Sequence, residues 1–441
     1  MVRLFLTLFI CLGSATIALC SVSGNTKSKV DYVAKWNELA RQGRDEGLNA
    51  APFYRKAAEL YVRRPEGIEN EDLFGWPSEL TNEKQWLLRQ WAESNSNAFA
   101  QLKLGTQKPY YWNQYQADNV WKVGDSSDLS GLGDIVRATL SRVKLSSVEA
   151  GMTRETTEDI LTCCRFGSHL GQTPDWSDQL VGTGILNAVV DTLFLCLGKT
   201  DFDPMLMDLL QRGVSSEFSK SQSCIYSMLE VEKLKHLEVV QMIFQSTQDD
   251  SKLKADEGMG LAARFDDLTY EDLQAVRRGR TMRDIEAAFA YCKEFFTTSP
   301  WQAKQKGLNF WEDLQKRTGE NPVVRFCMFD VPRDARLRAH CHAKTDALVT
   351  TLAVLRYRHD KGNLPKDLKE LIAAGYLSQL PMDPYSNGPL VYRQTGKEFV
   401  LYSFNEDFDD EGGKHSRQGW DEEDGDYVFW PVQTKSAEKE N

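Results

Sequence analysis

Apolar residues return at every third or fourth position through most of this chain, from Val30 to about Phe329. That spacing places them on one face of an α-helix, so the pattern predicts an array of short amphipathic helices. No repeat of fixed length runs through the array, and a regular solenoid is therefore not indicated. The helices expected are Asn82–Leu102, Gly131–Lys144, Thr153–Leu170, Leu180–Leu197, Asp203–Phe218, Ile225–Gln245, Tyr270–Phe296 and Gly307–Leu314.

A further helix is expected to begin near Asn49. The Asn49 side chain can cap it, and Pro52 fits its first turn, where a missing N–H has no cost. Tyr54 and Ala57 begin its apolar stripe, and the run Arg63-Arg64-Pro65 stops it. The pattern there is typical of a short surface helix with one buried face.

The pattern changes in the last hundred residues. A long helix is expected from about Asp334 to Asp360, ended by Gly362, and a short one from Lys366 to Ala374. The runs Leu390–Arg393 and Phe399–Ser403 read as two strands of a hairpin, joined through a turn that contains a glycine.

The predicted fold class is therefore a mainly α N-terminal helical array followed by a small α+β module. We expect a helical domain over 30–330 and an α+β module over 334–432, with a polar tail over 433–441. A chain of 441 residues exceeds the size at which single hydrophobic cores usually stop growing, so more than one domain is the prior expectation.

The first residues, 1–23, read as a signal peptide. Arg3 supplies a positive start, Leu4–Leu19 is almost wholly apolar or small, and Cys20–Gly24 offers small residues for cleavage. An uncleaved N-terminal membrane anchor is the rival reading, and lipidation of Cys20 is a third, although Leu19 is not the small residue that a bacterial lipobox places there. The expected location is extracytoplasmic, in the periplasm or secreted, with membrane attachment through the N-terminus left open.

Charge and cysteine content narrow the function classes. The net charge of -11 gives no general reason to bind nucleic acid. The cysteines beyond residue 20 are irregularly spaced and match no zinc motif, so we expect core thiols, with one disulfide at most. They are Cys163, Cys164, Cys196, Cys224, Cys292, Cys327 and Cys341.

No catalytic motif of a known type occurs in the chain, so catalytic residues remain unknown and a non-enzymatic role is favoured. An aromatic run at Tyr110, Tyr111, Trp112, Tyr115 and Trp121 could stack on sugar rings, but such clusters more often pack between helices. This run supports the alternative function, a carbohydrate-binding protein or hydrolase with its site in the helical domain.

His340 and His342 are the one histidine-rich spot. In a helix two residues that are two positions apart point about 200° from each other, so these side chains are not expected to chelate one ion. A helix face without metal is the favoured reading.

The segment from Asn405 to Asp426 is rich in carboxylates and glycines. Calcium takes six to eight oxygen ligands from side chains and backbone, which such a loop can supply. The spacing does not match an EF-hand, and a solvated acidic surface remains the competing interpretation. The carboxylates are Glu406, Asp407, Asp409, Asp410, Glu411, Asp421, Glu422, Glu423, Asp424 and Asp426.

Several short motifs follow one another in this tail in a distinctive order. They are a helix from Thr345, the turns Lys361-Gly362-Asn363-Leu364-Pro365 and Leu380-Pro381-Met382-Asp383-Pro384-Tyr385, the strand residues Leu390-Val391-Tyr392 and Leu401-Tyr402-Ser403, and then the acidic loop. The run resembles the globular part of the major pseudopilin of type II secretion systems, over roughly the last hundred residues. That resemblance implies a long helix, a small antiparallel sheet and a calcium loop.

By position, the resemblance implies three metal ligands: Asp407 as the first acidic ligand, and Asp424 and Asp426 as the closing pair. Carbonyl oxygens near Ser403 would complete the shell. The chain departs from the family in lacking a prepilin-peptidase site within Met1–Ser23, so we do not expect it to polymerise into a pseudopilus. It looks like an exported bacterial protein that reuses the module behind a helical domain.

The sequence thus predicts a cell-envelope protein with a binding or structural role, calcium in its C-terminal loop, and a protein partner that the sequence does not identify. One version has the module contact a secretion machine through an exposed apolar patch on the Thr345–Leu355 part of the long helix. That version fails if this part of the helix is buried.

Overall fold

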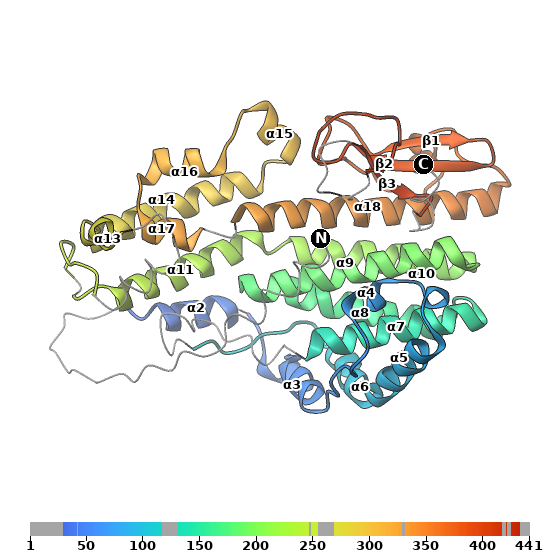
Figure 1. Cartoon of the computed structure of the whole chain (residues 1–441), viewed down its shortest axis with the longest axis horizontal. Coiled ribbons are helices and arrows are strands. Elements are labelled where there is room, and N and C mark those ends of the chain that lie inside the picture. The colour runs from blue at the N-terminus through green and yellow to red at the C-terminus, as the bar shows by residue number, and fades with distance from the viewer. Residues whose placement is uncertain are drawn as a thin grey trace.

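The computed structural model describes residues 30–41, 43–116, 131–246, 248–254, 269–328, 331–416, 420 and 425–432. Helices fill most of this part of the chain, and a small antiparallel sheet lies near its C-terminal end (Figure 1). The predicted fold class is therefore confirmed. The helices before the long C-terminal one are α2 (Tyr32–Arg41), η1 (Glu46–Leu48), α3 (Ala51–Glu59), α4 (Asn70–Phe74), η2 (Pro77–Glu79), α5 (Asn82–Ser94), α6 (Ser96–Gly105), α7 (Leu132–Ala150), α8 (Arg154–Gly171), α9 (Trp176–Lys199), α10 (Pro204–Gln222), α11 (Ile225–Ile243), α13 (Tyr270–Gln274), α14 (Arg278–Phe296), α15 (Pro300–Gln305), α16 (Phe310–Thr318) and α17 (Pro322–Cys327).

Two predicted helices are each divided in the structure. The expected helix Asn82–Leu102 is α5 and α6, which meet at Asn95. The buried Asn95 amide accepts a hydrogen bond from Val62 N at 2.9 Å and donates one to Val62 O at 3.0 Å, so this residue anchors a distant segment. The expected helix Tyr270–Phe296 is α13 and α14, and α15 was not predicted.

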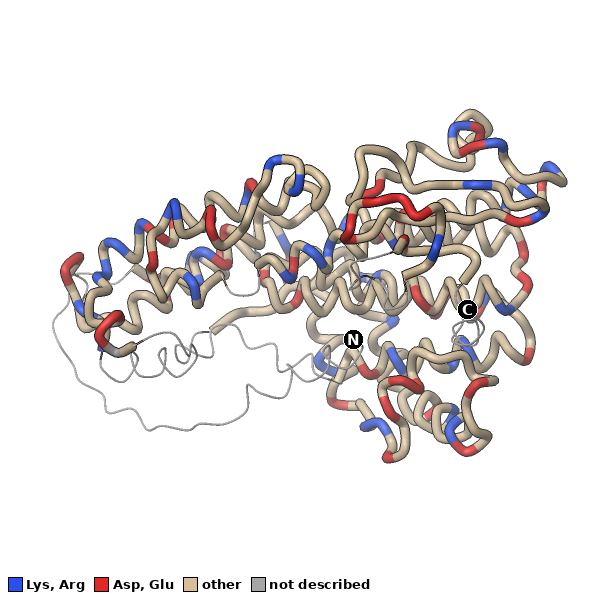
Figure 2. Tube along the Cα trace, turned by 45° about the horizontal axis from the view of Figure 1, so that its top comes forward, with Lys and Arg blue, Asp and Glu red and all other residues tan. Residues whose placement is uncertain are grey.

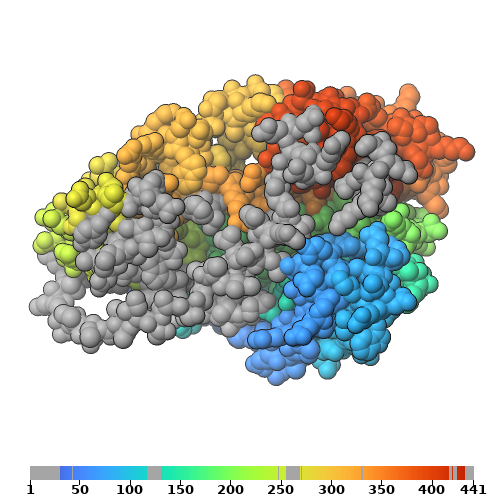
Figure 3. All heavy atoms as spheres, viewed as in Figure 1, coloured from blue at the N-terminus to red at the C-terminus, as the bar shows by residue number. Residues whose placement is uncertain are grey.

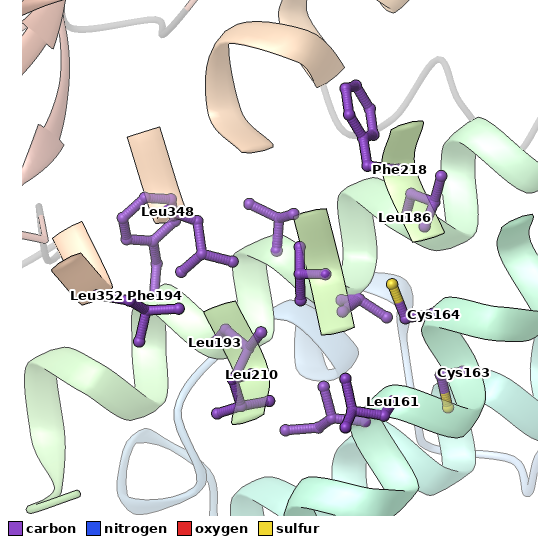
Figure 4. Close-up of a cluster of buried hydrophobic side chains, with 14 of the residues drawn as sticks. Leu161, Cys163, Cys164, Leu186, Leu193, Phe194, Leu210, Phe218, Leu348 and Leu352 are labelled. Atoms are coloured by element: carbon purple, nitrogen blue, oxygen red, sulfur yellow. The ribbon is translucent and has the colours of Figure 1, made fainter. Parts of the chain in front are cut away.

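The long helix α18 (Val331–Lys361) lies at the centre of the main hydrophobic core. In Figure 1 it runs between α9 and α10 on one side and the sheet on the other. Figure 4 shows Leu348 and Leu352 of α18 beside Phe194 of α9. Because this helix is covered on several sides, its apolar and small residues are spread around its circumference. The buried apolar residues that it contributes are Cys341, Ala343, Ala347, Leu348, Leu352, Ala353, Val354, Leu355 and Tyr357.

The main core includes side chains from both expected domains, 30–330 and 334–432. Ile160 and Val189, from the helical array, belong to the same cluster as Leu390, Phe399 and Trp430 from the C-terminal sheet. The division into 30–330 and 334–432 stays a prediction, since α18 belongs to the packing on both sides of it.

The sheet has three antiparallel strands in the order β1 (Val391–Thr395), β2 (Glu398–Ser403) and β3 (Tyr427–Trp430). The first two form the predicted hairpin, in which Val391 pairs with Tyr402. A short helix, α19 (Leu368–Ala373), precedes the sheet. The buried side chains of β2 and β3 face α18, and Phe399 stacks on Trp430 with 5.7 Å between the ring centroids.

A second core holds the segment 269–328, here called the arm, against α11. Buried residues such as Phe289, Phe310 and Val324 of the arm pack with Leu237 and Val240 of α11. Figure 1 shows the arm extending away from the sheet along the axis of the molecule, with α15 at the end that lies next to the sheet. The arm therefore reaches the C-terminal module through α15.

Helix α9 is long and apolar enough to cross a membrane by length and composition, but 61% of its most apolar window is buried inside the protein. It packs against α7, α8 and α18. Those contacts are typical of a core helix.

Glycines bring α8 and α9 close together. A Cβ atom added at Gly182 of α9 would lie 2.6 Å from Gly167 O and 2.8 Å from Gly171 N, both in α8. These separations are shorter than any ordinary carbon contact, so only glycine fits between the two backbones. The neighbouring Gly184 is exposed, with open space where its Cβ would be.

We expect Gly182→Ala to destabilise the protein by about 1–3 kcal/mol, because α8 and α9 must separate to admit the methyl group. The matched control, Gly184→Ala, should stabilise it by about 0.5–1 kcal/mol, because alanine loses less chain entropy in a helix. The urea midpoint of each full-length variant measures both effects. Equal midpoints for the two variants would contradict this packing.

Candidate functional site

The acidic loop joins β2 to β3 and is closed at its two ends. The buried Asp383 accepts hydrogen bonds from Ser403 Oγ at 2.7 Å and from Phe404 N at 3.0 Å, which fixes the entry to the loop. Asn405 has a φ of 66° and donates from Nδ2 to Gly425 O at 3.0 Å, which ties the entry to the exit. Figure 2 shows the resulting concentration of acidic residues at one end of the sheet.

Asp407, the first predicted ligand, strengthens this closure. Its Oδ1 accepts from Asp409 N at 3.1 Å and its Oδ2 from Gly425 N at 3.0 Å. Each carboxylate oxygen has further lone pairs, so these bonds leave Asp407 able to accept a cation as well. The second bond places its carboxylate beside the residue that precedes Asp426.

Asp426 is unusual among the described residues of the loop, because it is fully buried and one of its oxygens lacks a hydrogen-bond partner there. Oδ2 accepts from Gly413 N at 2.6 Å, whereas Oδ1 has no hydrogen-bond partner within the described residues. Burial raises the pKa of Asp426 to about 7; the Gly413 amide opposes this, and the charges of Glu411, Asp410 and Asp407 add to it. A buried oxygen surrounded by negative charge is a position that a cation would stabilise.

An arginine from β1 already places a positive charge against the loop. The Arg393 guanidinium from β1 donates to Gly412 O and lies over the ring of Tyr402, whose hydroxyl donates to Asp410 Oδ1 at 2.8 Å. Gly412 and Gly413 have positive φ values of 73° and 82°, conformations that a glycine adopts without strain. The arginine therefore offsets part of the repulsion on the Asp410 side of the loop.

The structure brings two of the three predicted ligands into one loop. Asp407 and Asp426 are linked through Gly425, and Asp424 lies outside the described residues. Among the described residues, no three His, Cys, Asp or Glu side chains form a group that could hold a metal. A complete shell at Asp407 and Asp426 would therefore need backbone carbonyl oxygens or water in addition to these carboxylates.

Sequence reasoning missed a second contact that positions the loop. His340 Nε2 of α18 lies 2.8 Å from Glu406 Oε1, and the His340 ring stacks on Trp420 at 4.3 Å. Burial lowers the pKa of His340, and the bond to Glu406 partly opposes that shift. His342 instead lies beside Phe218, so the two histidines contact different parts of the protein as the helix spacing predicts. The role of His340 as an anchor depends on a residue 66 positions away, which the local sequence pattern does not indicate.

The aromatic run at 110–115 is used in packing. Tyr111, Trp112 and Tyr115 are buried, and Tyr115 stacks on Trp36 at 4.2 Å. The Tyr110 hydroxyl donates to Asp45 O at 2.6 Å. The buried rings offer no open face for a sugar, and Trp121 lies outside the described residues. The carbohydrate alternative gains no support from these residues.

The apolar patch expected on α18 is absent from the described surface. Between Thr345 and Leu355 only Asp346 and Val349 are partly exposed, and all the other residues are buried. The version of the function in which this helix face contacts a secretion machine is therefore wrong. The face is occupied by α9 and α10 instead.

The seven cysteines in the described part of the chain are free thiols, and six of them are buried. Burial raises the pKa of Cys163, Cys164 and Cys292 among others, which lowers their reactivity. The expectation of core thiols is confirmed for the six buried cysteines, whereas Cys224 is partly exposed.

Comparison with known proteins gives no match: no family model, no curated protein and no solved structure is similar to this chain. The resemblance of its last hundred residues to the major pseudopilin therefore stays a prediction.

We expect Asp426→Asn to stabilise the metal-free protein at pH 8. The folded-state pKa of about 7 lies above the ordinary value of 3.8, so the stability contributed by this group falls as the pH rises through that interval. Asparagine keeps an oxygen for Gly413 N and cannot ionise. With a chelator present, the melting temperature of the variant should exceed that of the wild type at pH 8 by more than it does at pH 5, because at pH 5 only part of the interval between the two pKa values has been crossed.

The control is Asp409→Asn, which removes the same charge from an exposed side chain of the loop. It should give a smaller change at pH 8 than Asp426→Asn. A lower melting temperature for Asp426→Asn at both pH values would show that its carboxylate is not under electrostatic stress.

Proposed function

We propose that this chain is an exported cell-envelope protein with a non-enzymatic binding or structural role, and that its acidic loop binds calcium. The observation that carries the proposal is Asp426, a fully buried carboxylate with an oxygen that lacks a hydrogen-bond partner in the described structure. Burying a carboxylate without compensation is costly, and a bound cation would supply the compensation.

The chemistry of the loop favours calcium over other common metals. The ligands on offer are carboxylate and carbonyl oxygens, which are hard donors, whereas structural zinc sites use cysteine and histidine. Magnesium demands a compact octahedral shell, whereas calcium accepts irregular shells of carboxylates and carbonyls. In this proposal Asp407 and Asp426 hold the ion, together with Asp424.

A bound calcium ion would attract carboxylates from both ends of the loop and so hold the two ends together. Asp407 and Asn405 already tie the ends together through Gly425. An ion there would relieve the repulsion among Asp407, Asp410 and Asp426, and would fix the loop on β2 and β3. Its role in this proposal is structural: it sets the shape of the surface that the module presents.

An extracytoplasmic location fits such a site. Extracellular calcium modules bind with dissociation constants of about 10⁻⁴–10⁻³ M, and so a site of modest affinity is filled only where calcium is abundant. The signal peptide expected over 1–23 supports the same location. Burial of six of the seven described thiols is compatible with an oxidising compartment, since buried cysteines are poorly accessible to oxidants.

Calcium should raise the thermal stability of the mature protein, because the folded state binds the ion and the unfolded chain does not. At free calcium of about 100 times the dissociation constant, the gain is about 2.7 kcal/mol. The shift should be lost in Asp407→Ala and in Asp424→Ala. Thermal unfolding with calcium, with magnesium and with a chelator makes the measurement.

The matched control is Glu320→Ala, which removes an exposed negative charge from the arm. It should keep the full calcium shift. If calcium produces no shift in the wild type, or the same shift in all variants, the loop is a solvated acidic surface and the proposal fails.

A further inference from the structure

The arm touches the acidic loop through α15, at Asp407, one of the proposed calcium ligands. Lys304 Nζ donates a hydrogen bond to Asp407 O at 3.0 Å. One turn earlier, Trp301 N donates to Pro384 O at 3.0 Å, in the turn beneath the loop. Figure 3 shows the arm and the C-terminal module in direct contact along this edge.

Lys304 also lies over the ring of Phe408, with Nζ 4.3 Å from the ring centroid. Phe408 has a φ of 66°, a left-handed conformation that is unfavourable for an aromatic residue. Tyr385 approaches the same ring at 5.8 Å, and Phe408 N donates to Asn405 O at 3.2 Å. The lysine thus helps to hold the loop in a conformation that its own backbone does not prefer.

We propose that Lys304 is a built-in cation that competes with calcium for the loop and thereby couples ion binding to the position of α15. The inference rests on the proposed calcium function. It adds a regulatory contact from the arm, which lies outside the module that resembles the pseudopilin.

Lys304 and calcium compete because both are positively charged and both bind Asp407. In the described structure the ammonium group binds the carbonyl of Asp407, whose carboxylate is a proposed ligand. A divalent ion bound to the Asp407 carboxylate repels the Lys304 ammonium group. It also draws electron density from Asp407, which makes the carbonyl oxygen of that residue a weaker acceptor for the ammonium group. Calcium also accepts carbonyl ligands, so Asp407 O is an oxygen that both cations can use.

Thermodynamic linkage then works in both directions. If the contact of Lys304 with Asp407 weakens calcium binding, bound calcium weakens the contact by the same factor. Loss of that contact removes one of the bonds that hold α15 against the module. Calcium would thus stabilise the loop while loosening the end of the arm.

The test is calorimetric titration of calcium into the full-length protein. Lys304→Met keeps an apolar stem to cover Phe408 and removes the charge, so it should bind calcium more tightly, by up to about fivefold, the upper end of the range for an exposed charge interaction. Lys306→Met removes the same charge from the C-terminal cap of the same helix, where the residue is exposed, and should bind like the wild type.

Hydrogen exchange of the peptide that contains Trp301 supplies the second readout. Adding calcium to the wild type should increase its exchange, because α15 is released, and should change it less in Lys304→Met. Equal affinities in all three proteins, or weaker binding by Lys304→Met, would overturn the inference while leaving the calcium site in place. No binding by any of them would overturn the proposed function and this inference together.

Discussion

The structure depends on the burial of α18 on several of its faces. Small residues such as Ala343, Ala347 and Ala353 and large ones such as Leu348 and Leu352 are all buried along it. A helix with apolar residues around its circumference is stable only when neighbours cover each face. Helices α9 and α10 cover one side and the sheet β2–β3 covers another, so neither part can be removed without exposing this helix.

This constraint also places the acidic loop. The loop begins where β2 ends, and β2 lies on α18. His340, near the start of the helix, binds Glu406 at the beginning of the loop, and Asp383 fixes Ser403 and Phe404 just before it. Asp426 enters β3 from the other end and is buried beneath the loop. A concentration of carboxylates that would repel one another in a free segment is thus held on a rigid support.

Much of the helical array could be read from periodicity, because each helix buries one stripe of apolar residues. The breaks were harder to predict, since Asn95 interrupts its helix by binding Val62, more than thirty residues away. The position of Asp407 in the loop followed from the order of motifs along the tail. Two features depend on tertiary packing, and no local sequence pattern marks them. They are the lack of a hydrogen-bond partner for Asp426 Oδ1 within the described residues and the contact from Lys304 to Asp407.

Native-state hydrogen exchange of the full chain tests the central role of α18 most directly. If this helix is shared by both parts of the protein, the amides of 343–357 should exchange with the same free energy as the buried amides of α8 and α9, through one common unfolding event. If the segment 331–432 instead opens as a separate unit at lower free energy while α8 and α9 remain protected, α18 is not the element on which the fold depends.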